Sequence, residues 1–160
     1  MTKPRNDDGG TPFSNWLREQ PELDSKKQKL DIQNVDFVVH RYDAGEIMNV
    51  EEKRFLKEMS YSQWDTFSRI DRYNSDPLYR GFHLLQFERE TPEDGFILLD
   101  GLEITPAELK SFLRFEAAPE RYQSVFRRYG SLEELNRAIY FAKNSAALKA
   151  DKASTNASTV

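Results

Sequence analysis

The chain has 160 residues, no cysteine and a formal net charge of −4 at pH 7, and 38% of its residues are hydrophobic. Without cysteine it can form neither a disulfide nor a thiolate metal site, and its two histidines are too few for a multi-histidine zinc site. No apolar run approaches membrane-spanning length, and the N-terminus lacks the apolar core of a signal peptide. We therefore expect a soluble cytoplasmic protein without a membrane partner. The negative charge argues mildly against a stable nucleic-acid binder, because phosphate contacts dominate such affinity.

The expected elements begin with a polar tail over residues 1–10. A helix should then start at Thr11-Pro12, because threonine caps a helix and proline fits its first turn. A charged loop leads from this helix into a short first strand, indicated by the alternating Leu30 and Ile32.

The most informative stretch, residues 34–53, predicts two strands joined by a turn over residues 42–45. β-Branched and aromatic residues dominate its first half and alternate with polar ones. Gly45 can supply the positive φ that the turn needs. With this turn, pairing back along the hairpin sets Asp36 opposite Glu51, on one face of the sheet.

Two opposed carboxylates with a lysine beside them are costly to build without a function. Lys53 lies two residues after Glu51 and therefore emerges on the face that carries Asp36 and Glu51. Like charges directly opposite each other destabilise a sheet, and Mg²⁺ removes the repulsion because it binds through one or two carboxylates plus water and phosphate. The metal would activate a water and polarise a phosphoryl oxygen, while Lys53 would orient that water or neutralise developing charge. Such a site is suited to cutting phosphodiesters.

Asp36, followed by Glu51-Glu52-Lys53 at the end of the next strand, resembles the motif of the PD-(D/E)XK nuclease superfamily, which has the restriction-endonuclease-like fold. The resemblance implies Asp36 and Glu51 as metal ligands, Lys53 as the catalytic lysine and Mg²⁺ or Mn²⁺ as the cofactor. Val35 stands where the motif has its proline, and Glu52 occupies a position that is usually apolar. A rival register, with Glu52 as the ligand, therefore stays open.

Two more residues join the predicted catalytic set through this resemblance. Some members carry a glutamate on the first helix, where this chain has Glu19, and several carry a glutamine on the helix after the lysine strand, where it has Gln63. Each also has a plainer explanation, Glu19 as a solvated helix acid and Gln63 as the partner of Ser60 in a capping box. The candidate contacts to a phosphate backbone are Arg54, Lys57, Arg69 and Arg72.

The remaining elements complete the expected α/β architecture. A capped helix from Ser60 is followed by a strongly apolar strand over residues 82–87. The order of helix, three strands, helix and strand matches the αβββαβ core that the resemblance implies. Asp100-Gly101 then predicts a type I′ hairpin, followed by further helices. From Asn144 the composition turns to Ala, Ser, Lys and Thr, which favours a disordered tail.

The expected domain plan is a single nuclease-like domain between two disordered tails. The parts are the tail at 1–10, the domain at 11–143 with its core at 11–88 and its hairpin and helical appendage at 89–143, and the tail at 144–160.

The sequence thus predicts a metal-dependent nuclease that hydrolyses DNA phosphodiester bonds. Its size and element order also resemble small bacteriophage proteins, which would place it in the host cytoplasm. Two alternatives stay open. The chain could be a nuclease-fold protein without activity that binds DNA, RNA or a protein, or an interaction module whose acidic surface meets a basic partner. Binding of a divalent metal separates the first hypothesis from both others.

Overall fold

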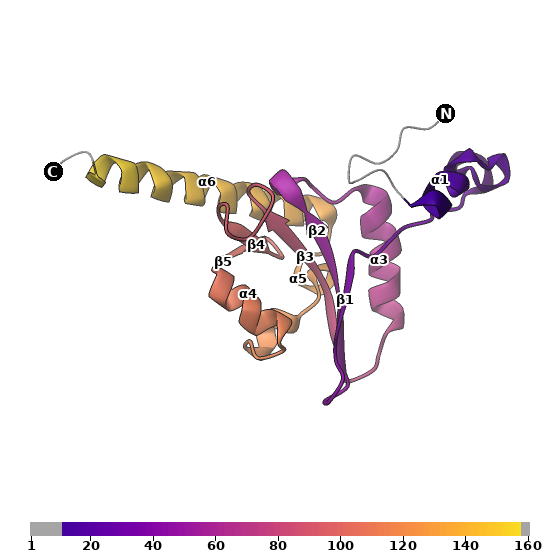
Figure 1. Cartoon of the computed structure of the whole chain (residues 1–160), viewed down its shortest axis with the longest axis horizontal. Coiled ribbons are helices and arrows are strands. Elements are labelled where there is room, and N and C mark those ends of the chain that lie inside the picture. Colours follow the sequence, from indigo (N-terminus) through magenta and orange to yellow (C-terminus); the bar gives the residue numbers. More distant parts are fainter. Residues whose placement is uncertain (1–10, 158–160) are drawn as a thin grey trace. The chain divides into compact units, whose positions relative to one another are not determined.

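A computed structural model describes residues 11–157 of the chain, which divides into two compact units, Met1–Asn34 and Val35–Val160 (Figure 1). The boundary between the two units falls within the single domain expected over residues 11–143, which stays a prediction. The tail predicted over residues 1–10 lies outside the described residues. As a whole the described chain is a mixed α/β protein, with a five-stranded mixed sheet and six α-helices.

The first unit contains short helices. Helix α1 (Pro12–Glu19) starts as predicted, and the hydroxyl of Thr11 accepts a hydrogen bond of 3.1 Å from the backbone N–H of Ser14. The 3₁₀ helix η1 (Pro21–Leu23) and helix α2 (Ser25–Gln28) follow.

The short strand predicted at Leu30 and Ile32 is wrong, because the backbone there is irregular. The two side chains are 40% and 45% exposed. Alternation specifies a strand only when one face of the strand is buried. Neither of these two side chains belongs to a hydrophobic cluster of the described residues. Of the three successive strands in the predicted αβββαβ order, the described residues therefore form only two.

The second unit is built on the sheet, whose strands lie in the order β1-β2-β3-β4-β5. β2 and β3 are parallel, and helix α3 (Tyr61–Tyr73) connects them, whereas the other neighbouring pairs are antiparallel. The strands are β1 (Phe37–Arg41), β2 (Glu46–Lys53), β3 (Tyr79–Phe87), β4 (Ile97–Leu99) and β5 (Leu102–Ile104).

The predicted register of the β1–β2 hairpin is confirmed. Phe37 pairs with Val50 and Arg41 pairs with Glu46, and Gly45 has the expected positive φ of 77°. The second predicted hairpin also forms, with positive φ at both turn residues between β4 and β5.

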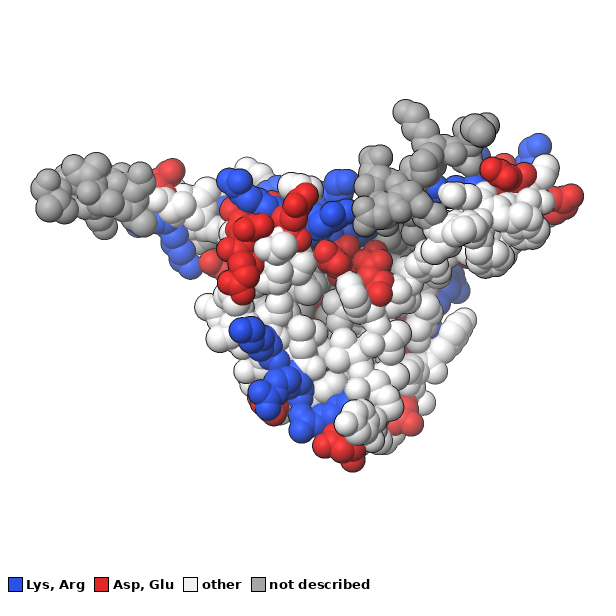
Figure 2. All heavy atoms as spheres, in the orientation of Figure 1, with Lys and Arg blue, Asp and Glu red and all other residues white. Residues whose placement is uncertain are grey.

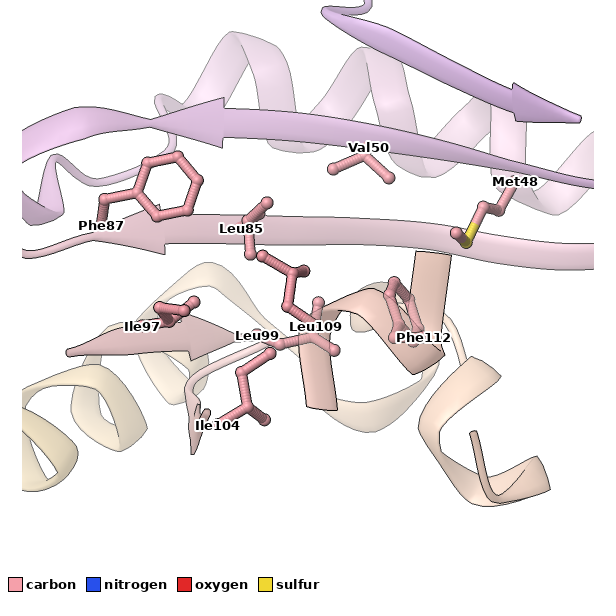
Figure 3. Packing of buried hydrophobic residues seen from close by; sticks show 9 residues of the cluster. All are labelled: Met48, Val50, Leu85, Phe87, Ile97, Leu99, Ile104, Leu109 and Phe112. Carbon is pink, nitrogen blue, oxygen red and sulfur yellow. The ribbon is translucent and has the colours of Figure 1, made fainter. Parts of the chain in front are cut away.

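Hydrophobic clusters cover both faces of the sheet. Helix α4 (Pro106–Leu113) closes one face, where nine buried side chains pack together (Figure 3): Met48, Val50, Leu85, Phe87, Ile97, Leu99, Ile104, Leu109 and Phe112. We call this set the α4 cluster. The opposite face packs against α3 and two later helices, α5 (Val125–Arg128) and α6 (Leu132–Ala157). Its buried members, the α3 cluster, are Met59, Phe67, Phe82, Leu84, Leu98, Val125, Leu132, Leu135 and Ile139.

The disordered tail predicted from Asn144 is instead helical as far as Ala157, because α6 continues through it. Alanine and lysine are strong helix formers, so the composition that suggested disorder also supports a helix. Ala146 is only 8% exposed, which shows that the helix still contacts the body of the unit at this point. Among the described residues, no helix combines the length and the apolar character needed to cross a membrane.

Candidate active site

Four of the five predicted catalytic residues come together where strand β2 ends beside the first turn of α3. Glu51 lies at the centre of the group. Its Oε1 accepts a hydrogen bond of 3.1 Å from Nε2 of Gln63 and lies 3.7 Å from Nζ of Lys53. Asp36 directly precedes β1, and continuing the observed register sets it opposite Glu51.

The strand pattern explains why these side chains share a face. Met48 and Val50 belong to the α4 cluster, so the alternating positions Glu51 and Lys53 turn toward α3. The carboxylate of Asp36 is anchored to the same strand, because its Oδ2 accepts a hydrogen bond of 2.9 Å from the backbone N–H of Glu52.

Glu51 is an unusual carboxylic acid because it is only 3% exposed. Burial and, second to it, the nearby charge of Asp36 raise the pKa of Glu51 from 4.5 to about 7, although the charge of Lys53 acts in the opposite direction. In the described part of the chain, Oε2 of Glu51 is buried and has no hydrogen-bond partner. A buried, unpartnered carboxylate oxygen is costly, and a cation is the ligand that would compensate it.

The geometry favours Glu51 over Glu52 as the metal-ligand candidate. Side chains alternate along β2, so Glu52 lies on the same face as Val50, which is the face that α4 covers and is opposite to that of Lys53. It is partly exposed, and burial followed by the charge of Asp36 also raises its pKa. Its contact with Asp36 runs through its backbone N–H, so its role in the observed arrangement is to fix Asp36.

Gln63 fulfils both roles that the sequence suggested. It completes the capping box of α3, in which Ser60 Oγ accepts from the Gln63 N–H and Gln63 Oε1 accepts from the Ser60 N–H, each at 3.1 Å. Its amide NH₂ is left to donate to Glu51, since an amide side chain carries both an acceptor and a donor. The helix cap therefore holds the Glu51 carboxylate.

Gln86, which no sequence pattern singled out, lies beside Lys53 in the parallel register of β2 and β3. Gln86 is fully buried, and its Nε2 donates a hydrogen bond of 3.0 Å to the carbonyl of Lys57. Because only the NH₂ group can donate to a carbonyl, Oε1 must point elsewhere, and it has no partner among the described residues. A glutamine within the apolar run of residues 82–87 was the available signal.

The predicted phosphate-contacting residues lie at different distances from this site. Arg54 and Lys57 follow Lys53 directly, in and just after the 3₁₀ helix η2 (Arg54–Leu56). Arg69 and Arg72 are exposed on α3, about 9 and 14 Å along the helix axis from Gln63 at 1.5 Å per residue. Arg69 also pairs with Asp65 at 3.5 Å. The first two are therefore adjacent to the site and the other two are not.

A separate group of basic side chains lies over α4 and the segment after it, at the lower left of Figure 2. In the chain, Lys110 belongs to α4, Arg114 follows the end of that helix, and Arg121 belongs to the 3₁₀ helix η3 (Pro119–Tyr122). Because α4 and α3 cover opposite faces of the sheet, this group is remote from Glu51. Glu19, the fifth predicted catalytic residue, ends α1 in the other unit, and its part in the site stays a prediction.

The donor set suits a metal that needs few protein ligands. Within residues 11–157, no group of three or more His, Cys, Asp or Glu side chains is arranged to hold a metal ion. Asp36 and Glu51 offer two carboxylates, which is enough for Mg²⁺ or Mn²⁺ when water, backbone or phosphate oxygens complete the shell. Such a cation would give Oε2 of Glu51 a partner, and it would reduce the repulsion between the carboxylates of Glu51 and Asp36.

Comparison of the chain with protein-family models, curated proteins and solved structures gives no significant match. The resemblance to PD-(D/E)XK nucleases therefore depends on the residues named above. Membership of that superfamily remains a proposal.

The raised pKa of Glu51 predicts how stability changes with pH in the absence of divalent metal. The folded state binds the Glu51 proton more tightly than the unfolded state, so unfolding becomes easier as the pH rises from about 4.5 to about 7. Between about pH 5 and pH 8 this group should remove about 2 to 3 kcal/mol from the free energy of unfolding. Glu51→Gln should abolish that loss and be the more stable protein at pH 8, as measured by urea denaturation in EDTA.

Glu103→Gln is the control, because Glu103 is an exposed acid on β5. If Glu51→Gln and wild type lose the same stability between the two pH values, Glu51 is not held as described.

Proposed function

We propose that the protein is a divalent-metal-dependent nuclease that hydrolyses DNA phosphodiester bonds, with a core of the restriction-endonuclease-like kind. One observation carries the proposal. A buried glutamate with a raised pKa and an unpartnered oxygen lies between an aspartate, a lysine and a glutamine, at the end of a strand.

The arrangement of the elements supports the same proposal. The acidic pair is carried by a β-hairpin, and the lysine strand is followed by a helix and a parallel strand. This is the expected order of the resembled core after its first strand, which residues 11–157 do not form. The glutamine lies on the first turn of the connecting helix, where the resemblance implies it.

Each side chain has a definable task. Asp36 and Glu51 would hold the Mg²⁺ or Mn²⁺ ion, which when bound supplies a Lewis acid and a water of lowered pKa. Gln63 fixes Oε1 of Glu51 and leaves Oε2 available for a ligand. Lys53 is 19% exposed at its side chain and can turn its ammonium from Glu51 to a substrate phosphate.

The negative net charge is compatible with this assignment. Arg54 and Lys57 add two positive charges within four residues of Lys53 in the chain, and a bound divalent cation would offset the charges of Asp36 and Glu51. A local positive surface is sufficient for an enzyme that holds its substrate only briefly.

Metal binding should distinguish Glu51 from Glu52. Mg²⁺ should raise the melting temperature of wild type at pH 8, by an amount worth about 1.4 kcal/mol at ten times the Kd. Asp36→Asn and Glu51→Gln should lose this shift, because each removes one of the two carboxylate ligands. Glu52→Gln should keep it, and calorimetric titration with Mg²⁺ gives the affinities. The opposite pattern, with Glu52→Gln alone losing the shift, would show that the assigned ligand is wrong.

Cleavage assays test the function itself. Supercoiled plasmid and single-stranded DNA, incubated with Mg²⁺ or Mn²⁺, should be cut by wild type. Lys53→Met should be at least about 100-fold slower, since it loses a charge that stabilises the transition state, while it retains the Mg²⁺-induced shift in melting temperature. Lys110→Met is the matched control on the opposite face of the sheet. If wild type cuts neither DNA nor RNA, a binding module becomes the better hypothesis.

A further inference from the structure

The turn that directly follows Lys53 has an unfavourable backbone at two bulky residues. Phe55 and Leu56, both within η2, have positive φ values of 57° and 54°. Left-handed backbone is easy for glycine and asparagine but strained for residues with large side chains. The segment Arg54-Phe55-Leu56-Lys57 contains neither glycine nor asparagine.

Neighbouring groups hold this turn in place. The backbone N–H of Phe55 donates a hydrogen bond of 3.0 Å to the carbonyl of Arg89, and that of Lys57 donates one of 3.3 Å to the carbonyl of Arg54. The carbonyl of Lys57 in turn accepts the hydrogen bond from the buried Gln86. The conformation of Phe55 is therefore imposed by contacts on both sides of the turn.

Other strained residues of the Val35–Val160 unit gain contacts from their conformation. Leu56 packs against the α3 cluster. Asp100, with a φ of 51°, accepts hydrogen bonds from His83 and from the backbone of Leu84, each at 2.7 Å. Phe115, with a φ of 61°, stacks on Tyr122.

The backbone of Phe55 is hydrogen-bonded, but its ring is not packed in the way that the Leu56 and Phe115 side chains are. Phe55 is 55% exposed and belongs to neither hydrophobic cluster of the described chain. A strained position with an exposed aromatic ring is a reason to look for a ligand, because such strain concentrates at functional sites.

The surroundings of Phe55 indicate what that ligand is. Lys53 and Arg54 precede it in the chain and Lys57 follows two residues later, so three cationic residues flank an exposed aromatic residue in sequence. Single-stranded nucleic acid is bound by this combination, in which cations contact the phosphates and an aromatic ring stacks on a base. In an intact duplex each base is already paired and stacked, so no base face is available to the ring.

We propose that Phe55 is a stacking platform for an unpaired nucleobase next to the scissile phosphate, so that the site takes single-stranded nucleic acid or an unpaired end in preference to an intact duplex. The inference rests on the proposed function, because it places the stacked base beside the phosphate that Lys53 contacts.

Binding of labelled oligonucleotides to the full chain tests the proposal. Fluorescence anisotropy is measured with a single strand of DNA, with RNA of the same sequence and with a hairpin-closed DNA duplex. Ca²⁺ replaces Mg²⁺, because it binds carboxylates but has a looser geometry. Phe55→Gly removes the ring and relieves the strained φ, Phe55→Trp keeps a platform, and Tyr42→Ala removes an 89% exposed aromatic side chain at the tip of the β1–β2 hairpin.

Phe55→Gly should weaken single-strand binding about tenfold and leave duplex binding within about twofold, since one stacked base is lost. Phe55→Trp and Tyr42→Ala should bind single strands like wild type. Phe55→Gly should also melt at the same or a higher temperature than wild type, which shows that its lost affinity is not unfolding. Comparison of the RNA and DNA strands tells which sugar the site prefers.

Two results would overturn the proposal in distinguishable ways. Single-strand affinity unchanged in Phe55→Gly rejects the platform while leaving the nuclease assignment in place. If wild type neither binds nor cuts any nucleic acid, both the stacking platform and the nuclease assignment are rejected. The exposed ring of Phe55 would then be explained by contact with a protein partner.

Discussion

The burial of Glu51 opposite Asp36 is the constraint around which the rest of the site is arranged. A carboxylate taken out of water and placed beside another negative charge is held at a raised pKa of about 7. Gln63 and Lys53 compensate one of its oxygens, and the other remains buried without a partner in the described chain. The fold maintains this arrangement through the hairpin register, which is fixed by the packing of Met48 and Val50 on the other face. A cation between the two acids is the simplest compensation for the remaining charge.

The fold and the site are coupled through helix α3. Its capping box uses Gln63 to satisfy the helix N-terminus, and the same amide donates to Glu51. Gln86 forms a second link, from the central strand β3 to the turn that carries Phe55. Both glutamines connect regular secondary structure to residues of the candidate site. This is how a site is kept rigid when its charged groups repel each other.

Local sequence patterns predicted the β1–β2 hairpin and its register correctly. The turn at Gly45 and the alternation around it specified the hairpin register, and that register placed Asp36, Glu51 and Lys53 on one face. The strand expected at Leu30 and Ile32 failed because alternation alone does not show whether a buried face is available. The helical segment after Asn144 was missed because small polar and alanine-rich sequence suits both a helix and a disordered tail. The positive φ of Phe55 could not be predicted, since tertiary hydrogen bonds impose it on a residue that does not favour it.

The most direct test of the central claim is to locate a bound paramagnetic ion. Substoichiometric Mn²⁺ added to ¹⁵N-labelled protein broadens the amide signals of residues close to the ion. If Asp36 and Glu51 hold the cation, the signals of residues 36–37, 51–53 and the first turn of α3 should broaden first and Mg²⁺ should reverse the effect. Signals at the hairpin tip, residues 42–45, should remain sharp. Broadening spread evenly over exposed acids, or centred on another part of the chain, would contradict the assignment of this pair as a metal site.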